Sequence, residues 1–215
     1  MFLELYKSSD RKHMENDAYE YLMIDNLVKN LTGSTKSKQI TAMDMESKMK
    51  GVVPSMFYIF SYLTELYDST GKYTYKDVIP LILCTNFDND YIYGLNFNFL
   101  TGPYRAVILD YIMELFPQFY SDTLSRAVET GDYVVNENLA KILYDEKLRL
   151  ALFSMIKNKF SIDLNLIYRR YIINNIVDIR LLEYDVWKYI PFLSFGESIR
   201  GANLAEVQSE ILANK

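Results

Sequence analysis

The region from Val53 to Leu100 constrains the fold most, because it contains three short runs rich in aromatic and β-branched residues. The runs cover residues 56–62, 78–84 and 91–100, and turn-forming residues bound each of them. This composition is typical of half-buried β-strands. Polar residues 86–90 form a short connection between the second and third runs, which favours an antiparallel hairpin.

Beyond Leu100 the apolar residues follow a helical period instead of a period of two. The spacing predicts a helix that starts near Pro103 and stops near Pro117, since proline suits a first helical turn and breaks a helix interior. Helical spacing also covers residues 137–160 and 165–174. Residues 176–182 then begin with apolar and polar alternation and predict a fourth strand, which a turn of helix at 184–189 follows.

Further short helices are predicted near both ends of the chain, at residues 17–31, 41–50 and 203–212. Taken together, the pattern predicts an α+β fold. It would be a small, strongly bent antiparallel sheet or an SH3-like barrel, with a helical insertion at 103–174 before the last strand. We expect an N-terminal helical segment at 1–50 and one α+β domain at 51–215.

Aromatic residues are unusually frequent, with 19 Tyr and 12 Phe against one Trp. An AT-rich genome would produce the same usage. Exposed tyrosines also suit protein interfaces, because the ring supplies apolar area while the hydroxyl binds a polar partner. Four tyrosines are candidate interface residues: Tyr91 and Tyr93 on the third predicted strand, and Tyr168 and Tyr171 in the predicted helix at 165–174.

The formal net charge of −5 argues against a protein that coats nucleic acid by bulk charge. Residues 147–180 are the exception, because this stretch contains seven basic residues and only two acidic ones. Basic side chains next to tyrosines can bind a phosphate backbone, and the candidates are Lys157, Lys159, Arg169 and Arg170. The same residues also fit the solvated faces of ordinary helices or a contact with an acidic subunit, and we favour that interpretation.

Catalytic patterns are weak. His13 is the only histidine and lies among charged residues near the N-terminus. Without a His elsewhere in the chain, we expect neither a Ser-His-Asp nor a Cys-His catalytic arrangement. One His and one Cys also cannot supply a zinc ligand set. No cofactor is therefore expected. A hydrolase that uses only carboxylates could draw on Asp88, Asp90, Asp110 or Glu114, but Asp88 and Asp90 lie where a turn favours Asp for backbone reasons.

Three residues at the corner between the third run and the first long helix have simple structural interpretations. Gly94 fits a close backbone approach or a bulge in the strand. Asn96 is expected to bond to nearby backbone, and Arg105 to pair with Asp110 or Asp77.

The sequence has no apolar run long enough to cross a membrane, and its start does not resemble a signal segment. We therefore expect no membrane partner. The chain is expected either in a cytoplasm or within a particle that is assembled there.

Several segments between residues 53 and 190 form a recognisable set: Met56–Tyr62, Tyr67-Asp68, Ile79–Ile82, Tyr93–Leu100, Arg105, Tyr168–Tyr171 and Trp187. Together these segments resemble structural proteins of tailed bacteriophages. In T-even-like and marine phages, similar proteins are often labelled DNA end protectors or virion structural proteins. The chain departs from that pattern at Thr64-Glu65 and at Asn98-Phe99.

The resemblance implies a non-enzymatic virion component of the neck, tail or baseplate, or one that protects the packaged DNA end. Its partners would be other virion proteins in a symmetric, multi-copy assembly, with a contact to DNA as an option. No catalytic residue is carried over. The alternatives are an intracellular phage nucleic-acid-binding enzyme or regulator that uses the basic stretch at 147–180, and a small-molecule enzyme.

Overall fold

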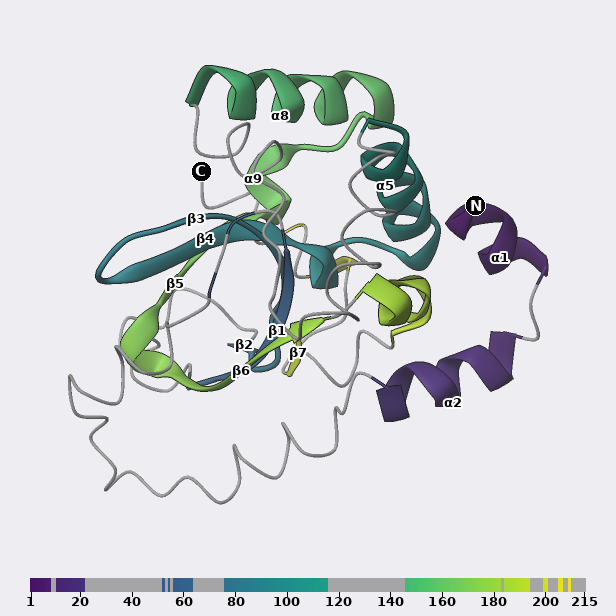
Figure 1. Ribbon diagram of the computed structural model, residues 1–215, viewed down its shortest axis with the longest axis horizontal. Coiled ribbons are helices and arrows are strands. Elements are labelled where there is room, and N and C mark those ends of the chain that lie inside the picture. The colour runs from purple at the N-terminus through teal and green to yellow at the C-terminus, as the bar shows by residue number, and fades with distance from the viewer. Residues whose placement is uncertain are drawn as a thin grey trace, which may run out of the picture.

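The computed structural model describes residues 1–8, 11–21, 52, 54, 56–63, 76–115, 146–182, 184–193, 199–200, 205–206 and 209. An antiparallel sheet lies at the centre, with helices around it (Figure 1). The strands are β1 (Phe57–Tyr62), β2 (Lys76–Asp77), β3 (Leu81–Phe87), β4 (Tyr91–Asn96), β5 (Tyr168–Ile172), β6 (Ile176–Leu182) and β7 (Ile199–Arg200). The helices are α1 (Phe2–Ser8), α2 (Arg11–Tyr21), η2 (Phe97–Phe99), α5 (Gly102–Leu115), α8 (Glu146–Phe160), α9 (Leu164–Ile167), η3 (Ile173–Asn175) and η4 (Tyr184–Phe192).

The main sheet has the strand order β5-β4-β3-β1-β6, and each neighbouring pair is antiparallel. The α+β class is confirmed, and so is the predicted hairpin, which is formed by β3 and β4. Strand β3 starts at Leu81, later than predicted, because Pro80 has no N–H to donate to a strand ladder. Val78 and Pro80 nevertheless accept backbone hydrogen bonds from β1, at 2.9 and 3.2 Å.

Strand β4 ends at Asn96 rather than at residue 100. The side-chain oxygen of Asn96 accepts a hydrogen bond from the backbone N–H of Asn98 at 2.7 Å and caps the 3₁₀ turn η2. This bond confirms the prediction that Asn96 bonds nearby backbone. Gly94 also lies as predicted, because a Cβ there would stand 2.7 Å from the carbonyl oxygen of Leu83.

The prediction of a helix at 165–174 was wrong. Only its two ends are helical, in α9 and in the 3₁₀ turn η3. Residues 168–172 between them form β5, which pairs with β4 from Tyr91↔Ile172 to Leu95↔Tyr168. These residues form a strand because the backbone of β4 is available for pairing on that side. Five residues are also too few for a helical spacing of apolar residues to favour a helix over this pairing. The helical insertion therefore ends before β5, and two strands of the main sheet, β5 and β6, follow it instead of one.

The two edge strands of the main sheet, β5 and β6, are consecutive in the chain and are joined only by the three residues of η3. Near this connection, the backbone N–H of Ile172 donates to the hydroxyl of Tyr62 on β1 at 3.2 Å. The N–H of Leu63 donates to the carbonyl of Asn175 at 2.9 Å. The end of β1 thus contacts both sides of the connection.

Alternating side chains of the strands build a core on each face of the sheet. On one face, Phe57 and Phe97 pack edge to face with ring centroids 4.7 Å apart, and Trp187 of η4 lies 4.8 Å from Phe57. Helices α5 and α8 contribute to this core. On the other face, Phe60 and Tyr171 belong to a second cluster, with ring centroids 5.1 Å apart.

Near the N-terminus, α1 was not predicted, and α2 starts before the predicted helix at 17–31 and shares its first turns. The predicted helix at 41–50 lies outside the described residues, as does the rest of 17–31. Within the predicted C-terminal helix at 203–212, the described residues 205, 206 and 209 are helical. No helix in the described ranges is long and apolar enough to cross a membrane.

Candidate functional site

The tip of the β3–β4 hairpin carries an ordered group of polar and aromatic side chains, which we call the hairpin patch: Asp88, Tyr91, Tyr93 and Arg170. One carboxylate oxygen of Asp88 accepts the backbone N–H groups of Asp90 and Tyr91 at 2.9 and 2.8 Å. The other accepts the hydroxyl of Tyr93 at 2.9 Å. The guanidinium of Arg170 lies 4.9 Å from the ring centroid of Tyr91.

These contacts fix the charge state of the patch. The hydrogen bond from the backbone N–H of Asp90 is the main reason why the pKa of Asp88 is lowered, so this carboxyl stays ionised at neutral pH. Partial burial is the main cause that raises the pKa of Tyr93, and its hydrogen bond to Asp88 adds to the shift. The hydroxyl therefore remains a donor, and the turn keeps its shape.

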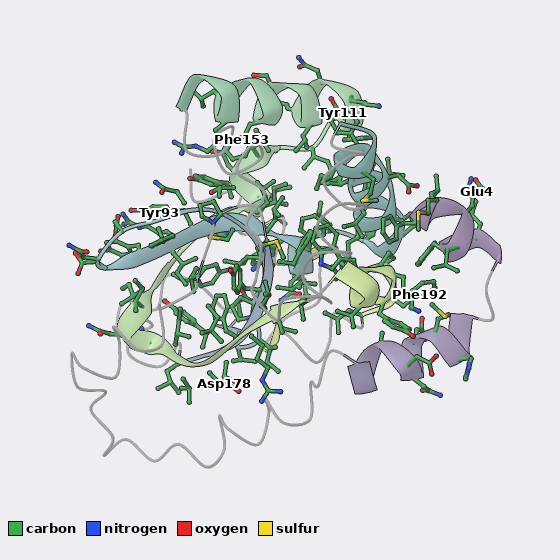
Figure 2. All side chains as sticks on the ribbon, in the orientation of Figure 1. Glu4, Tyr93, Tyr111, Phe153, Asp178 and Phe192 are labelled. Atoms are coloured by element: carbon green, nitrogen blue, oxygen red, sulfur yellow. The ribbon has the colours of Figure 1, made fainter. Side chains whose placement is uncertain are left out.

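The hairpin patch lies on the same face of the sheet as α8. Tyr93 and Leu95 are two residues apart on β4, and Leu95 shares a core cluster with Phe153 of α8. Figure 2 shows Tyr93 on the side of the hairpin that faces α8, with Phe153 beneath that helix.

The four predicted nucleic-acid residues do not form one group in the described structure. Lys157 and Lys159 are exposed on α8, where the ammonium of Lys159 lies 4.1 Å from the ring centroid of Tyr111. Arg169 and Arg170 are consecutive on β5, so their side chains point to opposite faces of the sheet. Only Arg170 belongs to the hairpin patch.

The predicted interface tyrosines also separate. Tyr91 and Tyr93 are half-buried neighbours with ring centroids 6.1 Å apart. Tyr168 is half-buried and packs on Phe153, with ring centroids 5.1 Å apart. Tyr171 is only 5% exposed, so the interface role predicted for it needs correction: its ring belongs to the core of this chain.

A second polar group is buried where β2, β4, η2 and β5 meet, and we call it the buried carboxylate cluster: Asp77, Asn96, Asn98 and Tyr171. One oxygen of Asp77 accepts the side-chain amide of Asn96 at 2.6 Å and the hydroxyl of Tyr171 at 2.8 Å. The other accepts the side-chain amide of Asn98 at 3.1 Å. Asn96 also donates to the Tyr171 hydroxyl.

Burial raises the pKa of Asp77 from 3.8 to about 6, although its three hydrogen-bond donors favour the ionised form. The carboxyl oxygens already accept internal hydrogen bonds, so the cluster ties the short strand β2 to the main sheet. From the sequence, Asp77 was predicted only as one of two possible ion-pair partners of Arg105. The sequence does contain a signal for this cluster, namely the two asparagines in the Phe-rich segment 96–99. Buried side-chain amides need polar partners, so this pair indicates a buried polar group nearby.

Three atoms near this cluster are buried and have no hydrogen-bond partner among the described residues: Nε and Nη2 of Arg169 and Oδ1 of Asn98. The guanidinium of Arg169 lies 5.0 Å from the ring centroid of Phe99 and carries charge near Asp77. The ring contact offsets part of the cost of burying this cation.

Arg105 does not pair with Asp110 or Asp77 as predicted. Its guanidinium is 2% exposed and donates to four backbone carbonyls, those of Phe97, Leu100, Ile190 and Leu193, at 2.8 to 3.2 Å. Desolvation lowers its pKa to about 10. Asp110 instead accepts the backbone N–H groups of Phe2 and Leu3 and caps α1.

Within the described ranges, no three His, Cys, Asp or Glu side chains gather in a way that could hold a metal ion. Comparison of the chain with protein-family models, curated proteins and solved structures finds no match. The geometry of the hairpin patch and of the buried carboxylate cluster is therefore the basis for a functional proposal.

Proposed function

We propose that this chain is a non-enzymatic structural component of a tailed-phage virion, in the neck, tail or baseplate or at the packaged DNA end. The observation that carries the proposal is the hairpin patch. Tyr and Arg are the residues most enriched at the energetic centres of protein interfaces, and here half-buried Tyr91 and Tyr93 of the hairpin lie beside the exposed Arg170 of β5. The segment similarity to tailed-phage proteins supplies the virion context.

The order within the patch supports a binding role. The Asp88 carboxylate holds the turn and the Tyr93 hydroxyl, while Arg170 stacks on Tyr91. A surface that is ordered before binding loses less side-chain entropy when a partner docks. Such a patch suits a subunit that holds its neighbours in fixed positions.

We further propose that the sheet is a strongly bent, SH3-like barrel. The strand order β5-β4-β3-β1-β6 supports this, because the three residues of η3 connect the opposite edges. A flat sheet of this order would hold its edge strands about 19 Å apart, but a three-residue connection spans at most about 14 Å. The hydrogen bond from Ile172 to the Tyr62 hydroxyl also supports a closed shape.

Mass spectrometry of tailed-phage particles, purified from the source of this sequence, tests the proposal. We expect the chain in a fixed ratio to the other virion proteins after repeated gradient purification. Loss of the chain during purification would contradict the virion role.

A contact with the DNA end is the part of the proposal that uses the basic residues, of which Lys157, Lys159 and Arg170 are exposed. An electrophoretic shift assay with duplex DNA tests it, because such binding weakens as salt rises. We expect Lys157→Glu with Arg170→Glu to abolish a shift that the wild-type chain gives at low salt. If the wild-type chain gives no shift even at low salt, the DNA contact is excluded and the neck, tail or baseplate role remains.

A further inference from the structure

The described part of α8, which lies on the same face of the sheet as the hairpin patch, presents a second surface. Leu150, Ser154 and Lys157 are exposed and follow one another at helical spacing, so they form a stripe on one side of the helix. Leu150 is 53% exposed, which is high for a leucine in the middle of a helix. We call these three residues the α8 stripe.

The two surfaces carry opposite charges. Asp88 and Asp90 are exposed at the hairpin tip, whereas Lys157 and its neighbour Lys159 are exposed on α8. Each surface also has an apolar centre, formed by Tyr91 and Tyr93 on the hairpin and by Leu150 on the helix. An acidic, aromatic surface and a basic, aliphatic surface complement one another in charge and in apolar character.

The same charges indicate which kind of partner binds the hairpin patch. Two carboxylates outnumber one arginine at the hairpin tip, so a cationic protein surface fits the tip better than a phosphate backbone does. A protein surface with exposed lysines around an apolar centre does fit. Such a surface is present on every copy of this chain.

We propose that the hairpin patch of one copy docks on the α8 stripe of a second copy, with Asp90 facing Lys157. The inference rests on the proposed structural role and names the partner of the patch. If the contact is reciprocal it closes a dimer, and if it is head to tail it builds a ring or filament. Both arrangements use the same pair of surfaces.

Sedimentation velocity of the purified full chain tests this contact over a range of protein and salt concentrations. We expect the wild-type chain to self-associate at low salt and to dissociate as salt screens the exposed charges. Asp90→Lys and Lys157→Glu should each weaken the association by roughly tenfold or more, and the double variant should recover most of the loss. Matched controls are Glu4→Lys and Lys7→Glu on α1, whose exposed side chains lie outside both surfaces.

A wild-type chain that stays monomeric at every concentration and salt would overturn the inference. So would single reversals that weaken the association without recovery in the double variant. Should Asp90→Lys disturb the turn in circular dichroism spectra, Asp90→Asn replaces it and is expected to weaken the association less. A monomeric chain that is still found in purified virions would overturn this contact but leave the proposed function standing.

Discussion

Asp77 is an ionisable residue in a place that water hardly reaches, with an exposed fraction of 8%. Three side-chain donors surround its carboxyl, yet desolvation dominates and raises its pKa to about 6. Arg105 shows a related arrangement, because a buried cation is bonded by backbone carbonyls and not by a carboxylate. Both residues are polar connectors between elements that are distant in sequence.

The raised pKa of Asp77 predicts a pH-dependent stability. The folded state holds this proton more tightly than the unfolded state, so the contribution of Asp77 to stability is fully present below pH 3.8 and is lost as the pH rises through about 6. The loss is about 3 kcal/mol for a shift of this size. Urea unfolding between pH 4 and 7.5, followed by the fluorescence of buried Trp187, measures it.

The control for this experiment is Asp77→Asn, which has no proton to lose. We expect the difference in unfolding free energy between wild type and variant to change across this pH range. A difference that stays constant from pH 4 to 7.5 would contradict the burial-shifted titration of Asp77.

Replacing Arg105 by Met should destabilise the fold by about 3 kcal/mol, because four buried carbonyls lose their donor. Arg105→Lys should recover little, since one ammonium cannot reproduce the planar fork that reaches both η2 and η4. Urea unfolding again provides the measurement. Arg170→Met is the matched control, and loss of its exposed ring contact should cost about 1 kcal/mol or less; equal losses would contradict the role assigned to Arg105.

At the scale of elements, the β3–β4 hairpin organises the described structure. Its tip carries the hairpin patch, and its outer strand accepts β5. Strand β4 approaches β3 closely at Gly94, opposite the register shift between Cys84 and Asn86. A side chain at this position would force the two strands apart.

Gly94→Ala should therefore destabilise the chain by about 1 to 3 kcal/mol, the usual cost of overpacking. The added Cβ would lie 2.7 Å from the carbonyl oxygen of Leu83, which is backbone and cannot move aside easily. Thermal unfolding measures the effect, with Ser154→Ala on the exposed side of α8 as a control. An unchanged melting temperature for Gly94→Ala would show that the strands have room at this point.

Strongly periodic segments were predictable from sequence, and long-range pairing was not. The hairpin, α5, the described part of α8 and β6 all follow local apolar spacing. Strand β5 was missed because its pairing with β4 joins residues on either side of the helical insertion. Asp88 was recognised as a turn residue and Gly94 as a close approach, but the carbonyl partners of Arg105 leave no signature in sequence.

At the scale of the whole molecule, the described residues form two aromatic-rich core clusters, and the hairpin patch lies on the same face of the sheet as α8. Among the described residues, the buried polar side chains Asp77, Asn96 and Arg105 form internal hydrogen bonds, and the hairpin patch joins exposed and half-buried side chains through contacts of its own. The sequence could predict the class of the fold and two residues of the patch, Tyr91 and Tyr93. It could not predict that Arg170 joins them, because that contact depends on β5.

The most direct test counts copies of the chain per purified particle by quantitative mass spectrometry, for wild type and for Tyr91→Ala with Tyr93→Ala. We expect the wild-type chain in a fixed ratio to the other virion proteins and a folded double variant that is largely lost from particles. Tyr104→Ala is the matched control, since Tyr104 is 47% exposed on α5, outside both surfaces. A wild-type chain absent from particles, or a double variant incorporated as well as wild type, would contradict the account.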